Sequence, residues 1–111
     1  MELQVQEFDG VIIVRIAGEI DGSTAPALQD QVLVVTQPGC KLLLDMGLVE
    51  FMSSAGLRVM LLLYRHISDG GGQIILVGLS EALQDTMAAT GFLKYFVMTA
   101  NVEAALEVLR Q

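Results

Sequence analysis

The first seventeen residues contain two segments with strand-like patterns on either side of a turn signal. Residues 3–7, LQVQE, alternate with a period of two, and residues 11–17, VIIVRIA, are rich in β-branched side chains. The Asp9–Gly10 pair between them is a strong signal for a tight hairpin turn. The sequence therefore predicts that the chain begins with an antiparallel pair of strands.

The next segments alternate between helical and extended patterns. Ser23 is expected to cap a helix over residues 24–36, in which Pro26 falls in the first turn, where its missing N–H costs little. Residues 40–46, CKLLLDM, form a short apolar run typical of a buried strand. From Ser54 onward, apolar residues recur at helical spacing: Leu57, Met60, Leu61, Tyr64 and Ile67. A strand is thus predicted to pass into a helix at the serine pair.

The carboxyl-terminal half repeats this alternation. SDGGG at residues 68–72 should end the helix, and QIILVGL at residues 73–79 is typical of another buried strand. Ser80 is expected to open a further helix that Gly91 closes.

The last segments are a brief strand and a helix. YFVMT at residues 95–99 is the strand, and Asn101 is a good cap for the helix over residues 102–111. One face of that helix would carry Val102, Ala105, Leu106 and Leu109. The predicted order is β-β-α-β-α-β-α-β-α. This order favours an α/β fold in which a single, mostly parallel sheet has one antiparallel N-terminal strand and about four helices.

Composition indicates one soluble domain over residues 1–111. Hydrophobic residues make up 53% of the chain and charged residues 17%, which favours a packed core over disorder. The longest apolar runs, such as VMLLLY at residues 59–64, are far shorter than the roughly 20 residues of a membrane-spanning helix. The N-terminus has no pattern of a signal peptide. We therefore expect a cytoplasmic protein that does not insert into membranes.

Charge and the scarcity of metal ligands narrow the function further. Cys40 is the single cysteine and His66 the single histidine, so we expect no metal site and no internal disulfide. The net charge of −7 opposes binding to nucleic acid, because that affinity comes mainly from lysine and arginine. A macromolecular partner is therefore expected to be a protein.

No arrangement typical of an enzyme is present in the sequence. There is no phosphate-binding glycine motif, and GGG at residues 70–72 ends a helix where a phosphate loop would begin one. His66 lies twelve residues beyond Ser54. On one helix this offset separates them by about 18 Å, too far for His66 to act as a base. We therefore expect no enzyme activity, no cofactor, and a surface position for His66.

The polar pair Ser53–Ser54 interrupts the apolar stretch at residues 42–61, LLLDMGLVEFMSSAGLRVML. One of these serines could simply cap the following helix, a role worth on the order of 1 kcal/mol. Alternatively, a hydroxyl at the carboxyl end of a parallel strand and the start of a helix is exposed where α/β sheets bind ligands and partners. Physical chemistry alone leaves both interpretations open.

Three stretches resemble the STAS family, specifically the bacterial anti-sigma factor antagonists. They are LLLDMGLVEFMSSAGLRVMLLLYR at residues 42–65, GEIDGSTAPALQD at residues 18–30, and GGQIILVGLSEALQDTMAATGF at residues 71–92. The predicted order of elements also resembles the STAS fold. The resemblance thus covers nearly the whole chain.

The resemblance implies a switch between protein partners. An antagonist of this type binds an anti-sigma factor that is also a serine kinase; phosphorylation of a motif serine abolishes binding, and a PP2C-type phosphatase restores it. The motif places the phosphoacceptor at Ser54. Ser53 stands where many members have aspartate and is a rival acceptor, and Ala55 stands where many have a second serine.

The resemblance also implies a partner surface around the serines. Asp21 matches a family position at that surface, although it could equally be an ordinary turn carboxylate. Gly56, like Ala55, is small enough to let a partner's backbone approach. Arg58 could steer an acidic partner, pair with a phosphate on Ser54, or simply be solvated. The predicted partner-binding set is Asp21, Ser53, Ser54, Ala55, Gly56 and Arg58.

A second hypothesis keeps the fold without the switch. A constitutive STAS adaptor, for example a small subunit of a transport or signalling assembly, would use the same surface without phosphorylation. We expect a monomer, with Phe92 as an exposed residue that could instead support association.

Overall fold

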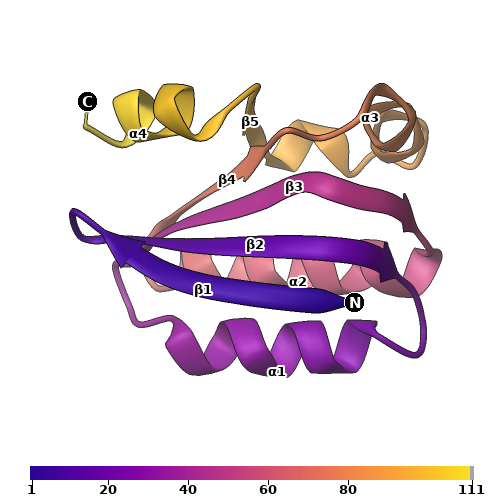
Figure 1. Ribbon diagram of the computed structural model, residues 1–111, viewed down its shortest axis with the longest axis horizontal. Helices are drawn as coiled ribbons and strands as arrows, with labels where there is room; N and C mark the ends of the chain where they lie inside the picture. The colour runs from indigo at the N-terminus through magenta and orange to yellow at the C-terminus, as the bar shows by residue number, and fades with distance from the viewer. Residues whose placement is uncertain (111) are drawn as a thin grey trace.

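The computed structural model describes residues 1–110 and contains one five-stranded sheet (Figure 1). The strands lie side by side in chain order, β1 (Glu2–Phe8), β2 (Val11–Ile20), β3 (Lys41–Met52), β4 (Gln73–Val77) and β5 (Val97–Thr99). β1 is antiparallel to β2, and every other pair is parallel. The predicted fold class and its antiparallel first strand are confirmed.

The β1–β2 connection is the tight turn that the sequence predicts. Asp9 and Gly10 both have positive φ, 54° and 79°. This combination is the one that Asp-Gly adopts in two-residue hairpins, because its twist matches that of the flanking strands.

Helices cover the two faces of the sheet unequally. α1 (Ala25–Val35) and α2 (Ser54–Asp69) lie on one face, and α4 (Val102–Arg110) lies on the other (Figure 1). α3 (Glu81–Ala89) follows β4, and its buried Leu83 and Met87 join the core on the α1–α2 side. α4 covers only the part of its face around Ile13 and Leu43, so the opposite ends of β2 and β3 are open there.

The larger core lies between the sheet and α1, α2 and α3. Leu57 and Met60 of α2 are buried in it, as expected, whereas His66 is exposed. The smaller core lies beneath α4, where Ala105 and Leu109 pack on Ile75 and Val77, with Val102 and Leu106 beside them. The apolar face predicted for the last helix is therefore confirmed.

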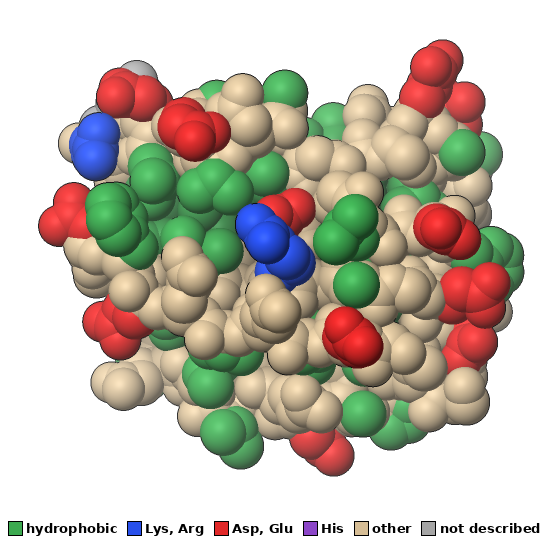
Figure 2. All heavy atoms as spheres, in the orientation of Figure 1, with side chains coloured by type: hydrophobic (Ala, Val, Ile, Leu, Met, Phe, Trp, Pro, Cys, Tyr) green, Lys and Arg blue, Asp and Glu red, His purple; other side chains and the backbone are tan. Residues whose placement is uncertain are grey.

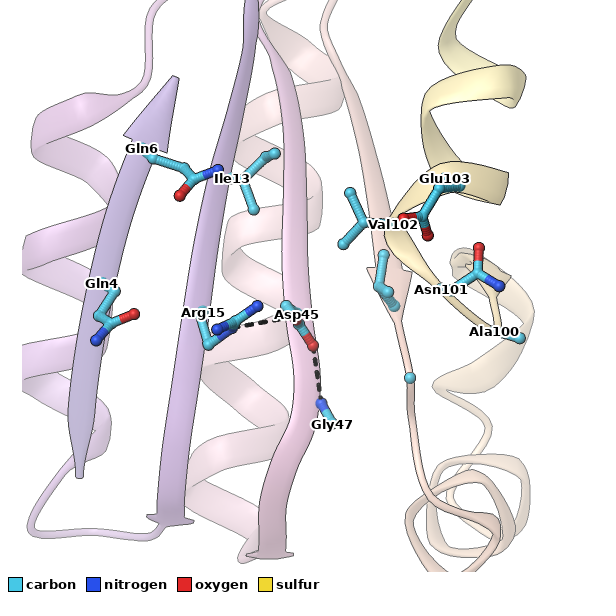
Figure 3. A pocket seen from close by; sticks show the side chains of 12 residues that line it. Gln4, Gln6, Ile13, Arg15, Asp45, Gly47, Ala100, Asn101, Val102 and Glu103 are labelled. Carbon is cyan, nitrogen blue, oxygen red and sulfur yellow. Dashed lines mark hydrogen bonds and ion pairs between the residues drawn. The ribbon is translucent and has the colours of Figure 1, made fainter. Parts of the chain in front are cut away.

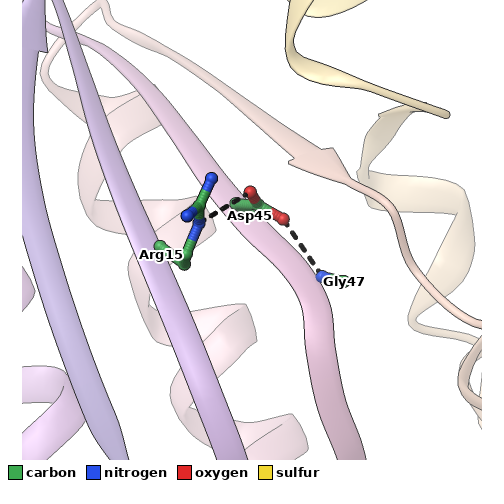
Figure 4. A network of polar contacts seen from close by, with 3 residues as sticks. All are labelled: Arg15, Asp45 and Gly47. Atoms are coloured by element: carbon green, nitrogen blue, oxygen red, sulfur yellow. Dashed lines mark hydrogen bonds and ion pairs between the residues drawn. The ribbon is translucent and has the colours of Figure 1, made fainter.

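β3 is longer than predicted because it continues to Met52 through two irregularities. Arg15 lies opposite Asp45, and two residues later Ala17 lies opposite Leu48, so β3 contains one extra residue. Oδ1 of Asp45 accepts a hydrogen bond from the N–H of Gly47 at 3.1 Å, and Oδ2 forms an ion pair with Nε of Arg15 at 3.3 Å (Figure 4). The Asp45 side chain thus satisfies a backbone donor that the bulge frees from the ladder.

A second extra residue follows within β3. Gly18 lies opposite Val49 and Glu19 lies opposite Phe51, which leaves Glu50 between two ladder positions. Each bulge accommodates one extra residue of β3 opposite a single residue of β2. The paired residues of the two strands therefore still face the same side of the sheet beyond each bulge.

Three helix caps were predicted, and two are confirmed. Oγ of Ser80 accepts from the N–H of Leu83 at 3.2 Å, and Oδ1 of Asn101 accepts from the N–H of Ala104 at 2.8 Å. The predicted cap by Ser23 is wrong: the N-cap of α1 is Thr24, whose side chain makes no capping bond.

Two expectations for residues 92–96 are wrong. Leu93–Tyr95 form a 3-10 turn, so the strand begins at Val97 rather than at residue 95. Phe92, expected to be exposed, is half-buried against the larger core. The 3-10 turn folds Phe92 and Leu93 back onto the helical side of the sheet.

Candidate functional site

The junction between β3 and α2 is fixed by backbone and side-chain bonds of Ser53. Its N–H donates to the carbonyl of Ile20 at 2.8 Å, which ties the junction to the end of β2. Its backbone is extended, and its Oγ accepts from the N–H of Gly56 at 3.4 Å. Ser53 is therefore the N-cap of α2, as one of the two interpretations of the pair required.

Ser54 is the first residue of α2, and its surroundings differ. Its side chain is exposed, and within residues 1–110 its hydroxyl has no hydrogen-bond partner. The neighbouring serines therefore have separate roles in the fold: the Ser53 hydroxyl holds the helix start, and the Ser54 hydroxyl points to solvent.

Gly56 is small for an internal reason. It is buried, and a Cβ atom there would lie 2.6 Å from Cγ of Met52 and 2.9 Å from both Cγ2 and the carbonyl oxygen of Ile20. The end of β2 therefore accounts for a glycine at this position, and the approach of a partner to Gly56 stays a prediction.

Asp21 follows Ile20 directly and holds the turn that leads into α1. Its Oδ1 accepts from the hydroxyl and N–H of Ser23 at 2.7 and 2.9 Å and from the N–H of Thr24 at 3.2 Å. The hydroxyl of Ser23 contributes most to lowering the pKa of Asp21, followed by the N–H of Ser23, with Thr24 adding to the effect. Asp21 is thus a turn carboxylate that carries its charge at neutral pH beside the Ser53 junction.

A shallow groove of about 310 Å³ runs between α1 and α2, next to the serines. Arg58 lies one turn into α2 and is exposed. Side chains from both helices line the groove, including Pro26, Gln29, Asp30, Ala55, Arg58 and Leu62. The groove brings together the predicted residues Ala55 and Arg58 with residues of α1 that the sequence did not single out.

The opposite face of the sheet has a hollow of about 470 Å³ that sequence reasoning missed (Figure 3). Arg15 and Asp45 lie at its floor, with Gln4 and Gln6 from β1 on one side and Asn101 and Glu103 from the start of α4 on the other. Since Asp45 already pairs with Arg15, this hollow offers no unmatched cation for an anionic ligand.

The model of the STAS domain family matches residues 2–105. The chain belongs to the STAS domain family. Within residues 1–110, none of the helices combines the length and the apolar character needed to cross a membrane.

Two similar proteins are named as anti-sigma factor antagonists. The anti-sigma-B factor antagonist of Bacillus subtilis is 29% identical over 107 residues, which cover 96% of this chain and 98% of that protein. The crystal structure of an anti-sigma factor antagonist from Mycobacterium paratuberculosis matches with a TM-score of 0.85 at 31% identity, covering 99% of this chain and 94% of that one.

A protein with a less similar sequence has the same fold. The unphosphorylated anti-sigma factor antagonist SpoIIAA matches with a TM-score of 0.81 at 19% identity, over 98% of this chain and 96% of that one. At this identity the likeness shows the fold alone. The resemblance that the sequence motifs suggested is therefore confirmed at the level of the family.

Proposed function

We propose that this STAS protein is an anti-sigma factor antagonist that phosphorylation of Ser54 switches off. Its partner would be an anti-sigma factor with serine kinase activity, and a PP2C-type phosphatase would restore the active form. The protein itself would be a substrate and binding partner, not an enzyme. The names of its relatives and the geometry of the serine junction support the proposal.

The observation that carries the proposal is the difference between the two hydroxyls. A kinase needs a hydroxyl that it can reach, and the Ser54 side chain is exposed at the first position of α2. The Ser53 hydroxyl is half-buried and already accepts the bond that caps the helix. Ser54 is therefore the preferred acceptor, and Ser53 remains its rival.

A phosphate on Ser54 would be tolerated by the fold. It adds a charge of roughly −1.5 to −2, which the N-terminus of a helix stabilises by about 0.3 to 1 kcal/mol at an exposed site. Arg58 is exposed four residues later and is in reach of such a phosphate. In a complex, a partner that covers the start of α2 would remove the hydration water of the phosphate. This desolvation would destabilise the complex and leave the free protein unaffected.

The test compares four baits in a pull-down from lysate of the source organism, with mass spectrometry of the retained proteins. The baits are wild type, Ser54→Ala, Ser54→Asp and Ser53→Asp. We expect wild type and Ser54→Ala to retain a kinase-like protein and Ser54→Asp to lose it. Incubation of wild type and Ser54→Ala with the retained kinase and ATP, followed by mapping of the modified peptide, then identifies the acceptor.

Each alternative gives a different pattern. Retention of the same partner on all baits would contradict the switch and support a constitutive adaptor that binds through the same surface. Release by Ser53→Asp alone, together with a phosphate mapped to residue 53, would move the switch to the capping serine.

A further inference from the structure

An apolar patch lies on the open face of the sheet, where β2 and β3 end. It consists of Ala17, Leu48 and Phe51, and the last two are 59% and 50% exposed. Ala17 lies directly beside Leu48, and Glu19 directly beside Phe51, in the parallel ladder. The two extra residues of β3 create the patch, because they keep Leu48 and Phe51 in phase with the outward-facing side of β2.

Acidic residues adjoin this patch. Glu2 of β1 lies beside Ala17 and Glu19 lies beside Phe51, and Glu50 is the extra residue of β3 that directly precedes Phe51. All three glutamates are exposed, and within residues 1–110 none of them forms an ion pair. Figure 2 shows the result: hydrophobic and acidic side chains are interleaved on the right-hand half of this face, with no Lys or Arg visible among them.

The amino group of Met1 lies near Gly18, and the nearest basic side chain along this side of β2 does not neutralise the glutamates. Arg15 lies two residues before Ala17 on the same side of β2, but Asp45 holds it in an ion pair at 3.3 Å. The patch therefore combines apolar side chains at its centre with neighbouring carboxylates that, within residues 1–110, pair with no basic side chain. This is the anatomy of a protein-binding surface, in which an apolar anchor is buried and rim charges select the partner.

The charge decides among the possible occupants. Joining two copies through this patch would bring Glu2, Glu19 and Glu50 of both copies together. These like charges would repel, as would the two molecules, which each carry a net charge of −7. Nucleic acid and the anionic leaflet of a membrane are repelled for the same reason. We infer that Ala17, Leu48 and Phe51 form a docking surface for a basic protein segment that inserts an apolar side chain between the glutamates.

This surface is separate from the groove beside Ser54. The groove lies between α1 and α2, whereas the patch lies on the sheet face opposite those helices. A second partner could therefore engage the patch while the first binds the start of α2. Negative charge added at Ser54 would strengthen the attraction of a basic segment, or leave it unchanged, rather than weaken it.

The test is an NMR titration of the whole ¹⁵N-labelled protein with two peptides that share an apolar centre. The cationic probe is acetyl-Arg-Leu-Phe-Lys-amide, and the matched acidic probe is acetyl-Glu-Leu-Phe-Glu-amide. We expect the cationic probe to shift the amides of residues 17–19 and 47–52 and to bind more tightly at low salt. Each exposed ion pair contributes roughly 1.4- to 5-fold to affinity, so two pairs should give at least about a twofold preference that added salt reduces.

Variants locate the binding. Phe51→Ser should weaken binding of the cationic probe, whereas Val34→Ser, which removes an 83% exposed apolar side chain from α1, should not. Combining Glu19→Lys with Glu50→Lys should reverse the preference between the two probes. Equal affinity for both probes, shifts confined to the α1–α2 groove, or no saturable shift at millimolar peptide would each overturn the inference.

Ser54→Asp separates this inference from the proposed switch. We expect this variant to bind the cationic probe at least as tightly as wild type, even though the same change should release the kinase. Loss of probe binding in Ser54→Asp would show that patch and switch are one surface, and would overturn the inference without touching the switch. Retention of the kinase by Ser54→Asp would refute the switch and leave the patch standing.

Discussion

The hydroxyl of Ser53 is an acceptor for the N–H of Gly56, so its removal should cost stability that removal of the next hydroxyl does not. We expect Ser53→Ala to lower the free energy of unfolding by about 0.5 to 2 kcal/mol, the usual cost of losing an N-cap. Ser54→Ala should change it by less than about 0.5 kcal/mol, as at other exposed positions. Urea unfolding of the two variants measures the difference.

The comparison has a useful internal control. Both substitutions are Ser to Ala at adjacent positions, so general effects of a lost hydroxyl cancel. If Ser54→Ala were the more destabilising of the two, the assignment of the cap to Ser53 would be refuted, and with it the argument that the Ser54 hydroxyl is free for a kinase.

Asp21 should make stability depend on pH in the acidic range. Its folded pKa is lowered by the bonds from Ser23 and Thr24, so its carboxylate stabilises the fold above the ordinary aspartate pKa of about 3.9, and this contribution is lost as the pH falls through the lower folded value. The stability difference between wild type and Asp21→Asn should therefore be constant near neutral pH and shrink below about pH 4. Asn keeps the acceptor oxygen, so the comparison isolates the charge.

Urea unfolding of both proteins between neutral and acidic pH measures this difference. A difference that stayed flat, or grew as the pH fell, would contradict the sign. The carboxyl ¹³C shift of Asp21 gives its folded pKa directly and should titrate below the ordinary range.

At the scale of single residues, the sequence predicted a cap best where only one candidate preceded the helix. Ser80 and Asn101 each had no competitor and both cap as expected. In the segment DGST, however, Asp21, Ser23 and Thr24 compete for the same backbone donors, and the carboxylate accepts them because an ionised acceptor is the stronger one. The packing reason for Gly56 was not predictable, because its neighbour Ile20 is far away in the sequence and close only in the fold.

At the scale of elements, β3 depends on the side chain of Asp45. It accepts from the N–H of Gly47 at the first bulge and pairs with Arg15. We expect Asp45→Ala to cost about 0.5 to 1.5 kcal/mol, the net value of a hydrogen bond, because the exposed N–H of Gly47 then bonds to water instead. Asp45→Asn, which keeps an acceptor, should cost less. Urea unfolding measures both, and hydrogen exchange of the Gly47 amide should accelerate in the Ala variant.

Arg15→Ala is the matched control for this prediction. It removes the ion pair, which is half exposed, but leaves the bond to Gly47 intact, so it should cost no more than about 1 kcal/mol. If Arg15→Ala were as costly as Asp45→Ala and left exchange at Gly47 unchanged, the ion pair and not the bulge would account for the role of Asp45.

The bulges also explain why the sequence predicted only half of β3. Residues 40–46 read as a buried strand, but the two extra residues break the alternation of GLVEF at residues 47–51, so neither a period of two nor a helical period fits. The ends of α2 and the β1–β2 turn were predictable because local signals set them. The exposure of Leu48 and Phe51 was not predictable, since it results from the pairing of β3 with β2.

At the scale of the whole molecule, the order of strands and helices followed from hydrophobic periodicity together with turn and cap signals. Alternating extended and helical patterns imply parallel strands with crossovers, and one hairpin signal fixed the antiparallel start. The unequal covering of the two sheet faces was not predictable. It arises because α4 is short and sits over one end of its face, which leaves the other end open for the apolar patch.

This division into two cores predicts that α4 can be weakened without disturbing the serine junction. Leu109 is buried in the smaller core, and its carbonyl accepts from Nζ of Lys41 at 3.0 Å. Leu109→Ala should cost about 2 to 5 kcal/mol, as for other buried leucines. Hydrogen exchange should rise most in α4 and least in α2, which packs in the larger core.

Two further variants serve as controls for Leu109→Ala. Glu107→Ala changes an exposed residue of the same helix and should have almost no effect. Leu63→Ala, in the larger core, should raise exchange in α1 and α2, because the helices on that side pack on one another and on the sheet. If Leu109→Ala raised exchange equally in α2 and α4, the two cores would unfold as one unit. A destabilising substitution on the patch face would then also increase unfolding of the start of α2, where Ser54 lies.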